Sequence, residues 1–63
     1  MELYRVLAYI SHGWTLTVKR DDECTEPFIA KLEKKKRTFF QTGYAPDQAL
    51  GKLEQYLHSL VSS

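Results

Sequence analysis

The side chains of this chain that are best suited to metal chemistry are two histidines, one cysteine and a short run of acids. His12 and His58 lie far apart in the sequence, and Cys24 is the only cysteine. A zinc site needs three or four protein ligands at workable spacing, and these three residues form no such motif. The acids at 21–23 lack the glycine-centred loop of a calcium site of the EF-hand type. The sequence therefore predicts no metal and no cofactor.

Catalytic residues are equally hard to assemble from this sequence. Cys24 follows Asp21, Asp22 and Glu23, and neighbouring acids disfavour the reactive thiolate. Ser11 precedes His12 directly, but both fall in a predicted tight turn rather than in a cleft. The three glycines are scattered, so no phosphate-binding loop is present. We therefore expect a protein that is not an enzyme.

A basic run is the strongest indication of a nucleic-acid partner. Lys34, Lys35, Lys36 and Arg37 are consecutive, and the aromatic side chain of Tyr44 follows a few residues later. Cations can contact phosphates and aromatic rings can stack on bases. The alternative is a solvated run that protects a sheet edge from aggregation, and the net charge of only +1 favours it.

Elements that could position these residues follow from the spacing of apolar side chains. Residues 3–10 are rich in apolar and aromatic side chains and predict a strand, with His12 and Gly13 as a hairpin loop. Residues 14–20, 28–33 and 38–42 predict three more strands. Pro46 opens an amphipathic helix. We therefore expect one α+β domain over residues 1–63, a small antiparallel sheet of three to four strands with one C-terminal helix on one face, in the order β-β-β-β-α.

The same spacing predicts which side chains form the core. The expected sheet residues are Leu7, Tyr9, Trp14, Leu16, Val18, Phe28, Ala30 and Leu32, with one of Phe39 and Phe40. The expected helix stripe is Ala49, Leu50, Leu53, Tyr56, Leu57, Leu60 and Val61. The choice between Phe39 and Phe40 stays open, because the last strand is apolar at both positions.

A strand over residues 3–10 would be apolar on both faces, and only one face can lie under the helix. Tyr4, Val6, Ala8 and Ile10 would then form an exposed apolar patch, which is typical of a protein interface. Because homodimers are the commonest soluble oligomers, we expect this patch to bind a second copy or another protein.

From Trp14 onward the pattern resembles the HicB family of antitoxins. The matching residues are Phe40-Gln41-Thr42-Gly43 at the end of a strand, followed by Ala45-Pro46-Asp47-Gln48-Ala49-Leu50 at the start of a helix. The resemblance implies the α+β fold and a protein partner such as a small RNA-cleaving toxin. Many members continue into a DNA-binding segment, and this chain stops at Ser63, so the resemblance does not imply DNA binding.

The cellular compartment follows from what the sequence lacks. A single cysteine suits a reducing compartment. Glu2 and Arg5 interrupt the N-terminal region in a way that is unlike a targeting signal, and no stretch approaches the ~20 apolar residues of a membrane span. We therefore expect a cytoplasmic protein with no membrane partner.

Overall fold

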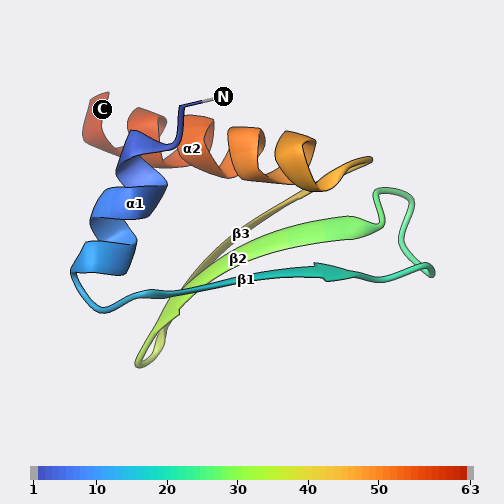
Figure 1. The fold of residues 1–63 in the computed structure, drawn as a ribbon, viewed down its shortest axis with the longest axis horizontal. Coiled ribbons are helices and arrows are strands. Elements are labelled where there is room, and N and C mark those ends of the chain that lie inside the picture. The colour runs from blue at the N-terminus through green and yellow to red at the C-terminus, as the bar shows by residue number, and fades with distance from the viewer. Residues whose placement is uncertain (1, 63) are drawn as a thin grey trace.

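The computed structural model describes residues 2–62, with side chains through Leu60, and forms two layers (Figure 1). Both helices lie on the same face of a three-stranded sheet. In chain order the elements are α1 (Tyr4–Ser11), β1 (Thr15–Arg20), β2 (Phe28–Lys34), β3 (Arg37–Gly43) and α2 (Pro46–Ser62). The α+β class is confirmed, but the order is α-β-β-β-α rather than β-β-β-β-α.

The sheet is an antiparallel meander with β2 in the centre, so β1 and β3 are its two edges. Leu32 of β2 lies opposite Leu16 of β1 and Phe39 of β3. Because side chains alternate along a strand, these three residues share one face. Ala30 and Leu32 are completely buried, so this is the face under the helices.

Residues 4–11 form helix α1, so the strand predicted over 3–10 is wrong. Leu3 and Val6 are one helical turn apart and lie against the core, and Val6 is only 1% exposed. The helix places Leu3, Val6 and Tyr9, which follow one another at three-residue spacing, on the face that packs against the core. Its opposite face stays exposed and is also apolar.

The N-terminus of α1 is completed by a side chain from the other helix. The backbone N–H groups of Arg5 and Val6 donate to the carboxylate of Glu54 at 2.9 and 3.0 Å. The Arg5 guanidinium lies 3.8 Å from the same carboxylate. Leu3 occupies the N-cap position and makes no side-chain cap bond, so Glu54 supplies the acceptor that the local sequence lacks.

His12 and Gly13 form a turn, but it joins α1 to β1 instead of closing a hairpin. Gly13 has a φ of +94°, a conformation that glycine adopts easily at the end of a helix. Its N–H donates to the carbonyl of Ile10 at 3.0 Å. The predicted hairpin between residues 3–10 and 14–20 is therefore wrong, because β1 pairs with β2.

The core agrees with the prediction on β2 and on part of α2. On α2 the predicted stripe residues Tyr56 and Leu60 are exposed, at 37% and 42%, so their assignment to the core is wrong. The completely buried side chains of these elements are Ala30, Leu32, Ala49, Leu53 and Leu57. Phe39 packs against this core and Phe40 is 59% exposed, which settles the choice between them. Leu7 and Val18 are exposed, so their assignment to the core is wrong. Leu7 faces outward because it lies on the far side of α1. Val61, also predicted in the helix stripe, has its side chain outside the described residues.

Helix α2 begins at Pro46, as the sequence predicts, directly after the end of β3. Gly43 makes this junction possible. A Cβ at residue 43 would lie 2.7 Å from the backbone N of Ala49, so only glycine lets the helix sit this close to the strand. None of the helices in the described part of the chain is long and apolar enough to cross a membrane.

Candidate functional site

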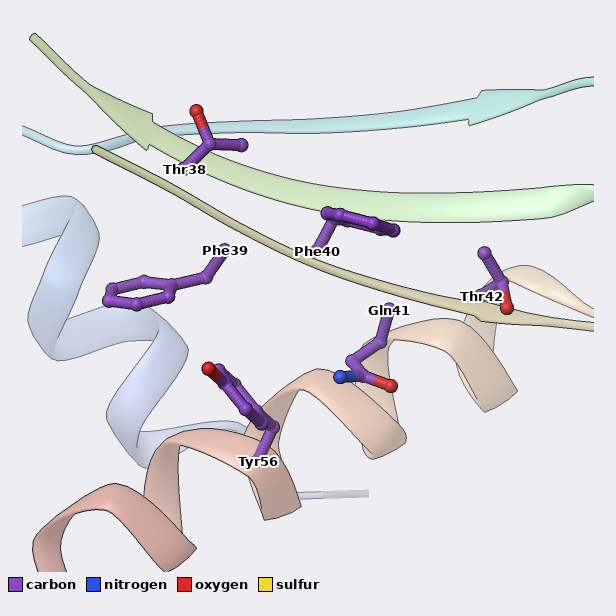
Figure 2. A pocket seen from close by; sticks show the side chains of 6 residues that line it. All are labelled: Thr38, Phe39, Phe40, Gln41, Thr42 and Tyr56. Carbon is purple, nitrogen blue, oxygen red and sulfur yellow. The ribbon is translucent and has the colours of Figure 1, made fainter. Parts of the chain in front are cut away.

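The free edge of β3 borders a shallow groove of about 320 Å³ (Figure 2). Residues 38–42 form one wall, and Tyr56 of α2 forms the other. Phe39 and Gln41 point toward the helices, whereas Thr38 and Phe40 point to the helix-free face of the sheet. The outer side of β3 has no strand partner in the described residues, so alternate N–H and C=O groups of this edge face outward.

The β3 edge is uncharged along the groove. Residues 38–42 have the sequence TFFQT, with high β-propensity and no proline. The ring of Phe39 lies 5.9 Å from the ring of Tyr56. Exposed edges usually carry charges or prolines that discourage pairing, and here Arg37 is the only charge, at one end. The edge is therefore suited to pairing with another strand.

A polar network closes the other end of the groove. The hydroxyl of Thr42 donates to the carboxylate of Glu26 at 2.6 Å, and the ammonium of Lys52 lies 3.0 Å from the same carboxylate. The hydrogen bond from Thr42, followed by that from Lys52, lowers the pKa of Glu26. Glu26 thus stays ionised beside the end of β3.

The basic run forms the hairpin between β2 and β3. Lys34 pairs with Arg37, and Lys35 and Lys36 make the two-residue turn. Lys35 has a φ of 55°, a left-handed conformation that costs a non-glycine residue roughly 1–2 kcal/mol. Glycine or asparagine would occupy such a position with less strain. Lysine at this position therefore costs stability and adds a charge.

Trp14 lies beside this hairpin and, with residues 34–37, lines a pocket of about 560 Å³. Its indole stacks on the ring of Phe39 at 5.2 Å and an angle of 15°, and Tyr9 contacts it edge-on. The Lys34 ammonium donates to the carbonyl of His12 at 2.8 Å and so ties the hairpin to the turn before Trp14. The indole is thus held in a fixed position next to four cationic side chains.

Trp14 was predicted only as a core residue, and its place at the basic hairpin was not predicted. The signal that could have found it is the register of β1 and β2. Because Thr15 pairs with Glu33, the residue before β1 must lie beside the end of β2. Tyr44 was expected near the basic run. It follows the other end of β3, so the structure places it away from the hairpin.

The predicted interface residues lie on α1 and not on an open sheet face. Val6 is buried, so it cannot contribute to an exposed patch, and that part of the prediction is wrong. Tyr4 is 68% exposed, Ile10 is 38% exposed and Ala8 is also exposed. Together with Leu7, at 60%, Tyr4 and Ala8 form an outward apolar stripe on α1. This stripe is a second candidate surface for a partner.

The residues considered for metal chemistry do not come together. No group of three His, Cys, Asp or Glu side chains in the described part of the chain could hold a metal ion. Cys24 is exposed, and its thiol lies 3.4 Å from the Asp21 carboxylate. The hydrogen bond to Asp21 raises the pKa of Cys24, as the neighbouring acids led us to expect. The thiol is therefore a weak nucleophile near neutral pH.

Comparisons of the chain with family models, with curated proteins and with solved structures each found no match. The HicB-like relationship therefore stays a prediction, and the β3 edge and the basic hairpin are the candidate functional surfaces.

Proposed function

We propose that this chain is a small, non-catalytic protein-binding module that binds its partner along the free edge of β3. The observation that carries the proposal is an unpaired edge with five consecutive uncharged residues, 38–42, beside an aromatic groove. Such an edge is a template for another strand. Addition of a strand, with side chains seated in an adjacent groove, is a recurring mode of peptide recognition.

A second copy of the chain is the partner that this edge fits best. Antiparallel pairing centred on Phe40 would place Thr38 of each copy opposite Thr42 of the other, and the two-fold axis would keep all helices on one face of a six-stranded sheet. No like charges would face each other within residues 38–42. The Arg37 end of one strand would lie against the end where Glu26 is ionised in the other, so the charges are complementary.

The test is the solution mass measured by light scattering for the parent chain and two matched variants. Phe40→Lys places a charge in the middle of the β3 edge, and Leu7→Lys places the same charge on the outer stripe of α1. The two residues are 59% and 60% exposed, so both substitutions should leave the fold intact. Circular dichroism would check the fold of each variant.

We expect a dimer for the parent chain and for Leu7→Lys, and a monomer for Phe40→Lys. A dimer that survives Phe40→Lys and is lost in Leu7→Lys would move the interface to α1 and overturn the β3 proposal. A parent chain that is monomeric at about 0.1 mM would exclude the second copy as the partner, since a useful dimer should form well below that concentration.

The HicB-like resemblance suggests a narrower version, in which a small toxin occupies the β3 edge in place of the second copy. A toxin encoded by an adjacent gene should then be tolerated when co-expressed with the parent chain. Phe40→Lys should abolish this rescue and Leu7→Lys should preserve it. Rescue that is unaffected by Phe40→Lys would contradict binding of a toxin at this edge.

A further inference from the structure

We infer that the β2–β3 hairpin and Trp14 form a second binding site, whose ligand is single-stranded nucleic acid. One base would stack against the indole, and the adjoining phosphates would lie on the lysines of the turn. This site lies at the hairpin end of the sheet, and its turn cations Lys35 and Lys36 lie outside the segment 38–42 that would pair at the β3 edge.

The cations of the hairpin are available to a ligand. In the described part of the chain no carboxylate lies within ion-pair distance of Lys35, Lys36 or Arg37. The acidic loop at 21–23 lies at the opposite end of the meander, beyond β1, so it does not neutralise the hairpin (Figure 1). The hairpin end of the sheet is therefore locally basic, although the net charge of the whole chain is only +1.

An aromatic side chain and a pocket accompany these cations. Trp14 lines the pocket of about 560 Å³, which is within the range of small-molecule sites. Phe39 and Tyr9 brace the indole, so little side-chain freedom is lost when a base stacks on it. A braced aromatic ring beside a basic groove is the arrangement that single-strand binders use.

The backbone of Lys35 in the β2–β3 turn also favours a ligand at this site. Lys35 keeps a left-handed backbone in which glycine would be less strained, and its side chain makes no ion pair with a described residue. A strained residue that gains nothing within the fold favours a role toward a ligand.

Trp14 is the only tryptophan, so its fluorescence reports on this site directly. The probe is an oligothymidylate of about 12 nucleotides, a length within the range of site sizes of small single-strand-binding domains. It is titrated into the parent chain at low salt. We expect quenching of the indole emission. If two to three phosphates are contacted, affinity should fall roughly 7- to 18-fold between 50 and 200 mM salt.

Two charge-reversal variants separate this site from general electrostatics. Lys35→Glu with Lys36→Glu removes the turn cations, and Lys19→Glu with Arg20→Glu makes the same charge change at the far end of β1. We expect the first variant to lose at least tenfold in affinity and the second to lose less than threefold. Lys35→Gly, which relieves the turn, should raise the unfolding midpoint and still weaken binding severalfold.

Several outcomes would overturn the inference. One is an absence of quenching up to 0.1 mM probe. Another is quenching that is unchanged in the variant Lys35→Glu with Lys36→Glu. A third is an equal loss of affinity in both charge-reversal variants. Thymidine monophosphate that binds as tightly as the oligonucleotide would show a free-nucleotide pocket and exclude the single strand. A duplex of the same length that quenches equally would exclude stacking on an unpaired base.

Discussion

Replacing Glu54 by alanine should lower the free energy of unfolding by about 2 kcal/mol, because this one carboxylate caps a helix that has no cap of its own. Its side chain is 15% exposed and accepts N–H groups of Arg5 and Val6 at 2.9 and 3.0 Å. Loss of a helix N-cap costs roughly 0.5–2 kcal/mol, and hydrogen bonds to a charged acceptor contribute roughly 1.5–3 kcal/mol. The ion pair with Arg5 adds little, because its two charges are 3.8 Å apart and the Arg5 side chain is 35% exposed.

The consequence should extend beyond the cap. Helix α1 has only eight residues, too few to be stable alone, so its contact with α2 holds it in place. Loss of the Glu54 cap should also weaken the packing of α1 on the core at Val6. In a chain of this size, a loss of about 2 kcal/mol corresponds to a fall of roughly 8–16 °C in Tm.

Urea unfolding monitored by circular dichroism and by Trp14 fluorescence would measure the effect. Glu54→Gln keeps one acceptor oxygen and should lose about half as much as Glu54→Ala, because it keeps a neutral hydrogen bond. Gln55→Ala, at the exposed neighbouring position of α2, is the control and should change stability by less than about 0.5 kcal/mol. If Glu54→Ala stays within about 0.5 kcal/mol of the parent chain, the capping argument is wrong.

Three further predictions concern other named contacts. Gly43→Ala should lower the free energy of unfolding in urea by about 1–3 kcal/mol, because the new Cβ would lie 2.7 Å from the backbone N of Ala49. An unchanged free energy would mean that the junction between β3 and α2 is loosely packed. Asp21→Asn should speed alkylation of Cys24 by iodoacetamide near pH 8, because it removes the carboxylate that raises the pKa of the thiol. Asp22→Asn is the control, and equal alkylation rates in the two variants would argue against the role of Asp21. The lowered pKa of Glu26 means that its contribution to stability is present above the ordinary value of 4.5 and is lost as pH falls through its folded value. Glu26→Gln should therefore flatten the loss of stability on the acid side of 4.5, and an unchanged acid limb would show that Thr42 and Lys52 do not hold this carboxylate.

The sequence by itself determined the part of the chain from β1 to α2. Alternating apolar residues predict β1 and β2 because side chains in a strand alternate between faces, and the β-branched and aromatic residues at 38–42 predict β3. Pro46 and the apolar spacing after it predict α2 because both are properties of neighbouring residues. These signals are local, so they need no knowledge of the fold.

Tertiary structure decided the N-terminal element and the makeup of the candidate sites. Residues 4–11 carry strand-like composition, but the acceptor that caps them as a helix is Glu54, 49 positions away. The pairing of β1 with β2 brings Trp14 to the basic hairpin, and β3 keeps a free edge because β2 is its only strand partner in the described residues. Each of these features depends on contacts between distant residues, and local periodicity carries no information about which distant partner a side chain will meet.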